Sequence, residues 1–183
     1  MTKTAARFRA VRSFTDAALL FVAPKHVLET ISEDRPVSQS VLQILFWGVL
    51  AGALDSAAIL LGVQSGSGDF LPILTIIVLA GPFFLATSAV FTLAYHGLAK
   101  LARGKAALRT SFHIVAALIP LLTADIIFGR IPFIRIPFLL FKFYLAFLSV
   151  ELVHRAERKR ALYVFGPAFA LVLLVNLRFW IAG

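Results

Sequence analysis

One stretch decides the class of this protein: residues 132–162, which read PFIRIPFLLFKFYLAFLSVELVHRAERKRAL. From Ile134 to Leu152 the sequence is mostly apolar, and its charged residues are Arg135, Lys142 and the closing Glu151. Roughly 20 apolar residues suffice for an α-helix to cross the hydrocarbon core of a bilayer. A basic run, residues 154–160, follows directly, as is typical where a span meets the cytoplasm. The stretch therefore predicts a membrane-spanning helix that ends on the cytoplasmic side.

The composition of the whole chain agrees with a membrane protein. Of its 183 residues, 60% are hydrophobic and only 15% are charged, and the mean hydropathy is +0.92. A soluble domain is about 45–50% apolar and about a quarter charged. The formal charge of +9 would suggest nucleic acid in a soluble protein, but here the cations lie in short loops between apolar stretches. Orientation in the membrane and anionic lipid explain them better, so we expect no nucleic-acid partner.

The sequence predicts an all-α fold, a polytopic membrane helix bundle of about five transmembrane helices. We divide the chain into residues 1–40, a basic cytoplasmic arm with amphipathic interfacial helices, and residues 41–183, the transmembrane domain. Pro24 suits the first turn of a short helix within the arm. The arm's amphipathic pair is expected either in the headgroup region or on the protein's own cytoplasmic face. The predicted spans are 41–63, 70–98, 110–129, 134–152 and 161–182.

Lysine and arginine are distributed unevenly between the two sides of this bundle. Fourteen fall in the arm, the loop near residues 100–109 and the loop near 155–160, whereas three fall in the segments predicted on the opposite side. Because cytoplasmic loops carry the excess of basic residues, we expect a cytoplasmic N-terminus and an external C-terminus. A bacterial cytoplasmic (inner) membrane is the expected location.

Ionisable residues inside the predicted spans are costly in lipid and are functional-site candidates. At about 1.5 Å per residue, Asp55 and Lys142 lie at similar depths below the outer side, so they would pair if their helices touch. Asp125 lies nearer that side and matches Arg135 or Arg130 better. The preferred interpretation is an ion pair that locks two helices. The alternatives are a proton or ion pathway, contact with a partner subunit, or no pairing.

Three histidines fall near the cytoplasmic ends of predicted spans: His96, His113 and His154. Their similar depth would permit a metal or haem site. No two of them have the i, i+3 or i, i+4 spacing that places two ligands on one helix face, so ordinary hydrogen bonding is the preferred interpretation. The chain has no cysteine and no sequence motif of an enzyme. We therefore expect no metal, no cofactor and no enzymatic activity.

Two faces are candidates for helix packing or for contact with a partner. Gly48 and Gly52 form a small-xxx-small stripe, which lets helices approach closely or dimerise. Phe141 and Tyr144 belong to an aromatic-rich span that suits lipid contact and helix packing, or else a platform for a partner helix. A third group comprises basic residues in loops that suit anionic lipid. These candidate lipid contacts are Arg103, Lys105, Arg158, Lys159 and Arg160.

Three segments resemble the Yip1-domain membrane proteins in their bacterial form. Residues 23–31 (APKHVLETI) resemble the lead-in before that family's first span, and residues 102–120 (ARGKAALRTSFHIVAALIP) resemble its polar loop and proline-containing span. Residues 143–162 (FYLAFLSVELVHRAERKRAL) resemble its tyrosine-containing span and basic loop. The resemblance implies five spans in this orientation. Eukaryotic relatives in vesicle traffic carry a DLYGP-type motif and a glycine-tyrosine motif, which this chain lacks, so their role is not implied.

Two classes of function remain after these exclusions. The first is a non-enzymatic membrane scaffold or accessory subunit that binds other membrane proteins, or further copies of itself, and anionic lipid. The second is a small transporter or channel in which Asp55 and Lys142 line a path between helices broken by prolines. Five spans without an evident internal repeat argue against the second, so we prefer the first.

Overall fold

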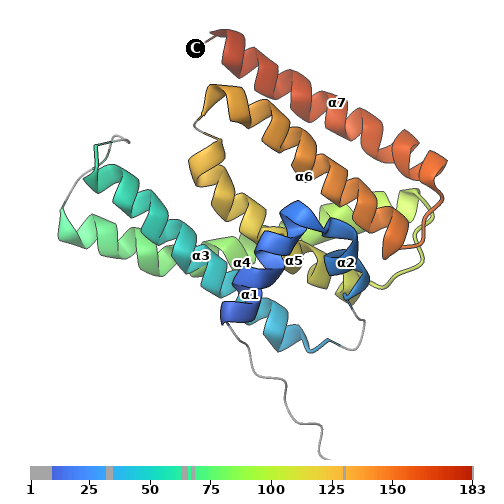
Figure 1. The fold of residues 1–183 in the computed structure, drawn as a ribbon, viewed down its shortest axis with the longest axis horizontal. Coiled ribbons are helices and arrows are strands. Elements are labelled where there is room, and N and C mark those ends of the chain that lie inside the picture. Colours follow the sequence, from blue (N-terminus) through green and yellow to red (C-terminus); the bar gives the residue numbers. More distant parts are fainter. Residues whose placement is uncertain (1–9, 32–34, 63–65, 67–68, 130, 183) are drawn as a thin grey trace, which may run out of the picture.

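The computed structural model describes residues 10–31, 35–62, 66, 69–129 and 131–182. In these ranges the chain is all-helical, with seven helices and no strand (Figure 1). Five helices are long and apolar enough to cross a membrane, which confirms the predicted helical membrane class. The two short helices are α1 (Ala10–Val22) and α2 (Pro24–Glu29). The long ones are α3 (Val37–Leu60), α4 (Phe70–Leu101), α5 (Leu108–Phe128), α6 (Pro132–Leu152) and α7 (Arg158–Ala182).

The long helices agree with the predicted spans to within a few residues. Pro24 begins α2, as expected for a residue whose fixed φ suits the first turn of a helix. The helix α3 begins directly after Pro36, four residues earlier than predicted, and the first turn of α7 consists of basic residues. Prolines at 82, 120, 137 and 167 all lie inside helices. Membrane helices tolerate them because neighbouring groups satisfy the freed backbone carbonyls.

The closest helix contact joins α3 to α4 through glycine. A Cβ on Gly48 would lie 2.9 Å from the Cα of Gly81, and one on Gly52 would lie 2.7 Å from the Cβ of Ala80. The two backbones therefore touch where side chains would keep them apart, which is how small residues promote helix association in membranes. Of the two predictions for this face, close packing or dimerisation, the structure has close packing, with α4 of the same chain on it.

The core of the bundle is centred on α5, whose side chains are the most completely buried of the long helices. It packs against α3, α4 and α6, and Thr123 donates a hydrogen bond of 3.1 Å to the carbonyl of Trp47 on α3. The last helix, α7, packs on α6 and α4 at the periphery (Figure 1). Consequently α5 faces mainly protein, whereas α4 and α7 expose apolar side chains as lipid-facing helices do.

The short helix α1 packs against the middle of the long helices (Figure 1). Ser13 accepts a hydrogen bond of 2.8 Å from the indole N–H of Trp47, which lies about 15 Å along α3 from its start. Leu20 is fully buried with Leu121 and Phe138. Those two residues lie about 20 Å from the ends of α5 and α6 that adjoin loops 102–107 and 153–157. The amphipathic helix thus buries its apolar face in the protein.

The two helices of the amphipathic pair lie at different depths of the bundle. Both pack on the protein itself, α1 at the middle of the spans and α2, followed by Ile31, at the end where α5 begins and α6 finishes. The physical reason is that a stripe of Ala17, Leu20 and Val27 has the same periodicity whether it faces lipid or protein.

Candidate functional site

Two loops dock on each other at one end of the bundle. Residues 102–107 join α4 to α5, and residues 153–157 join α6 to α7. The backbone N–H of Lys105 donates a 2.8 Å hydrogen bond to the carbonyl of His154. Gly104 lies against the imidazole, since a Cβ there would come within 3.1 Å of its Nδ1. We call this end, comprising Arg35, the two loops and residues 158–160 of α7, the basic end.

Each of these loops places an arginine in the left-handed backbone region. Arg103 has a φ of 62° and Arg155 a φ of 53°, the two non-glycine residues with positive φ in the described ranges. The N–H groups of Arg103 and Gly104 bond to the carbonyls of Lys100 and Ala99, which is the pairing of a Schellman motif. Glycine is usual at such a position because a side chain there costs about 1–2 kcal/mol. Here both positions carry a cation.

A pocket of about 490 Å³ opens at the basic end. Three parts of the chain form it: the end of α2, the loop before α5, and the end of α6 with the loop after it. Its charged lining residues are Lys105 and Arg155, which are positive, and Glu29, which is negative. The remaining lining residues are Leu28, Ile31, Ala106, Thr110, Leu152 and Val153, and the exposed wall is about equally polar and apolar.

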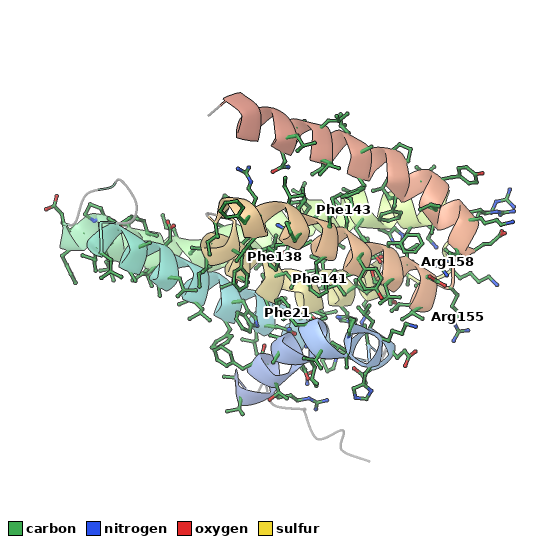
Figure 2. All side chains as sticks on the ribbon, turned by 45° about the horizontal axis from the view of Figure 1, so that its top comes forward. Phe21, Phe138, Phe141, Phe143, Arg155 and Arg158 are labelled. Carbon is green, nitrogen blue, oxygen red and sulfur yellow. The ribbon has the colours of Figure 1, made fainter. Side chains whose placement is uncertain are left out.

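The predicted lipid contacts gather around this pocket. Arg103, Lys105, Arg158 and Lys159 are exposed, and Arg155 and Arg158 project from the same end of the molecule (Figure 2). Arg160 is partly buried and forms a 3.1 Å ion pair with Glu157. The sequence predicted neither the pocket nor the positions of Arg155 and Glu29 in its lining. The basic run contained Arg155, but nothing local indicates that the end of α2 approaches that loop.

A buried polar chain lies beneath the docked loops. The Ser111 hydroxyl is 2.8 Å from Nδ1 of His96 and 3.1 Å from Nε2 of His154. A hydroxyl carries one proton, so it donates to one ring and accepts from the other. His154 Nδ1 is buried without a partner. We assign Nε2–H of His154 as the donor to Ser111, because this leaves an unpaired acceptor on Nδ1 instead of a costlier unpaired N–H.

The three histidines do not form one site. His113 bonds through Nδ1 to the Ser40 hydroxyl at 2.8 Å, apart from the chain through Ser111. Within the described ranges, no group of three or more histidine, aspartate or glutamate side chains could hold a metal ion. The hydrogen bonds to serine match the preferred interpretation of these histidines. The sequence did not identify Ser40 and Ser111 as their partners, because serine is common in membrane helices.

The environment of His154 predicts a pH dependence of stability. Burial, followed by the nearby His96 and Lys100, lowers the pKa of His154 from 6.5 to about 4. As pH falls from 6.5 to 4, His154 becomes protonated in the unfolded chain but stays neutral in the folded chain. Stability should therefore fall across that window, by on the order of 3 kcal/mol in total, and be independent of His154 above it. We expect the thermal midpoint in detergent to drop accordingly, and His154→Gln to flatten the profile. A variant with the wild-type profile would contradict this assignment.

The intramembrane ion pair differs from the predicted one. Nζ of Lys142 lies 2.8 Å from Oδ2 of Asp125 and 5.2 Å from the centre of the Phe138 ring. Arg135, predicted as a partner for Asp125, instead donates to the side chain of Asn176 on α7 at 3.1 Å. The predicted pair of Lys142 with Asp55 is replaced by the pair with Asp125, because in the described residues α3 packs mainly on α4 and α5. Arg130, the other predicted partner of Asp125, lies outside the described residues. The flexible lysine stem reaches along α6 to a carboxylate nearer the turn.

The aromatic residues of α6 lie in different surroundings: some contact α1 or α7, and others are exposed. Phe141 stacks on Phe21 of α1 at 5.3 Å between ring centres (Figure 2). Phe143 contacts Phe169 of α7 at 4.4 Å. Tyr144 is exposed, and it remains available to lipid or to a partner. The predicted packing role therefore applies to Phe141, with α1 as a neighbour that the sequence did not indicate.

Comparisons of the chain with protein-family models, with curated proteins and with solved structures find no match. The similarity to Yip1-domain proteins therefore stays a prediction from three sequence segments. The function has to be argued from the geometry of the chain.

Proposed function

We propose that this protein is a non-enzymatic integral membrane scaffold or accessory subunit. It binds anionic lipid at its basic end and other membrane proteins through its lipid-facing helices. The proposal includes a cytoplasmic location for the basic end, in a bacterial inner membrane, and kinship with bacterial Yip1-domain proteins. The observation that carries it is the collection of exposed cations on two loops that dock on each other.

The arrangement of these cations supports the lipid part of the proposal. Arg103 and Lys105 lie in the loop between α4 and α5, and Arg158 begins α7, yet all belong to the end where α4 and α6 finish and α5 and α7 begin. Basic residues beside an anionic membrane surface contribute about 1 kcal/mol each. Electrostatic attraction of this kind fixes the depth and orientation of the protein in the membrane, and it needs no catalytic residue.

The geometry favours this function over a transport path. Lys142, which the transporter hypothesis places along a path, forms a close ion pair with Asp125. Tyr95 of α4 and Ser149 of α6 are also bonded to each other, at 2.7 Å. Interactions of this kind hold helices together. An ion that followed a path past Lys142 would first have to break the ion pair between Lys142 and Asp125.

The test isolates the protein together with its native lipid and compares it with a triple variant, Arg103→Gln, Arg158→Gln and Lys159→Gln. We expect patches of native membrane, cut out by a polymer, to contain excess anionic lipid and a stoichiometric membrane-protein companion. The enrichment should fall several-fold in the variant because three cations near the surface are lost. A second comparison protein is Arg12→Gln, which removes one exposed cation of α1 and keeps Arg103, Arg158 and Lys159. Equal enrichment in all three proteins would overturn the proposal.

A further inference from the structure

We propose that the pocket at the basic end is a binding site for the headgroup of one anionic phospholipid. Lys105 and Arg155 hold the phosphate, and the apolar wall receives the glycerol and the first methylenes of the chains. This inference rests on the proposed function and sharpens it, since it replaces a diffuse attraction with one built site.

The size and lining of the pocket suit such a molecule. Ligand sites in proteins are typically about 300–1,000 Å³ with mostly apolar walls and a few placed polar groups. The pocket holds about 490 Å³, and its wall is about half polar, with Ile31, Leu152 and Val153 supplying apolar surface. A free phosphate or a nucleotide would leave these side chains facing water. A lipid has both a phosphate and apolar matter next to it.

The position of the pocket also suits a lipid of the same leaflet. Leu152 is the last residue of α6, whose 21 residues match the thickness of a bilayer. The pocket therefore lies where the hydrocarbon region gives way to headgroups. A phospholipid reaches it without leaving the membrane.

The charges of the lining determine which headgroup fits. Two cations and one carboxylate give a net charge of +1, which a single phosphodiester neutralises. Glu29 disfavours extra negative charge, so its removal should tighten the binding of an anionic headgroup. If the ligand instead carried an ammonium group, Glu29 would hold it, and the same removal would weaken binding. The glutamate thus distinguishes the two headgroup classes.

The backbone holds Arg155 at the pocket in a left-handed conformation. Its positive φ is a conformation that glycine or asparagine adopts at lower cost. Such residues persist where the side chain serves a function, and a cation at the mouth of a pocket meets that condition. The same strain at Arg103 lies outside the pocket lining, and it provides a matched control.

The test counts bound lipid by native mass spectrometry after phosphatidylglycerol is added to the protein in a non-ionic detergent. The pocket variant carries Lys105→Gln and Arg155→Asn, where asparagine keeps the left-handed backbone acceptable. The matched control carries Arg103→Asn and Lys159→Gln. At about 0.5 M salt the Debye length is only about 4 Å, so general surface attraction is screened. We expect one retained lipid per wild-type chain, and affinity at least about tenfold lower in the pocket variant.

Three further arms separate the outcomes. Glu29→Gln should raise the affinity for phosphatidylglycerol, whereas a loss would assign an ammonium-bearing headgroup and overturn the anionic assignment. Phosphatidylcholine and sn-glycerol 3-phosphate should not compete, and competition by the latter would assign a free phosphate instead. Equal retention by the pocket variant and its control would overturn the pocket. If the pocket lipid persists while native membrane patches show no anionic enrichment, the proposed function fails and the pocket stands.

Discussion

Replacing Gly52 by leucine should prevent stable association of α3 with α4. The Cβ alone would lie 2.7 Å from the Ala80 Cβ and 3.0 Å from the carbonyl oxygen of Ile76. Neither atom is the free end of a flexible side chain, so the helices have to separate. Overpacking costs about 1–3 kcal/mol or more. Because this contact runs along the most tightly packed pair, we expect at least about 3 kcal/mol and little folded protein in detergent.

The control for Gly52→Leu is the same substitution at Gly97, on α4. A Cβ on Gly97 meets no atom within 4 Å, and the residue is exposed. Gly97→Leu should leave the thermal midpoint unchanged or raise it, since leucine has the better helix propensity. The comparison keeps the chemical change constant and alters only the space around it. Equal losses at the two positions would show that the glycine contact does not hold the helices together.

Removing the charge of Lys142 should destabilise the bundle, and removing that of Asp125 as well should restore it. Lys142→Met leaves the Asp125 carboxylate, whose side chain is 40% exposed, without its cation. Breaking a fully buried pair costs about 3–5 kcal/mol. With this exposure we expect a loss of about 2 kcal/mol. In Lys142→Met combined with Asp125→Asn the orphan charge is gone, so most of that loss should be recovered.

A double-mutant cycle on unfolding in detergent measures this coupling. The matched cycle uses Asp55→Asn in place of Asp125→Asn. Lys142→Met should not compensate there, because its ammonium group bonds to Asp125. Coupling between positions 55 and 142, with none between 125 and 142, would contradict the observed pairing.

The sequence predicted those features that depend on one helix at a time. The apolar length of each span sets its ends, and the glycines at 48 and 52 indicate a close approach whichever helix is the partner. The pairing of charges depends on which helices touch. Depth along a helix gave Lys142 and Asp55 similar heights, but α3 and α6 are not packed against each other. No local pattern contains that information.

The basic end also combines features that the sequence predicts with features that depend on how distant segments meet. Exposed cations in loops are visible in the composition, and the predicted residues Arg103, Lys105, Arg158 and Lys159 lie together there. The pocket was not predictable, since it requires the end of α2 to meet loops that lie more than 70 residues further along the chain. The left-handed arginines were also hidden, because glycine is the residue that signals such a turn.

The burial of α1 against the middle of the bundle determines the order in which the chain is completed. Leu20 packs with Phe138 and Leu145. The ribosome adds these two residues roughly 120 residues after Leu20, a delay on the order of 10 s. During that interval α1 has part of its site already, because Phe14 contacts Trp47 of α3 and Leu20 clusters with Leu121 of α5. The side of Leu20 that meets α6 stays uncovered until that helix is made. A chain cut short before α6 therefore exposes this apolar surface.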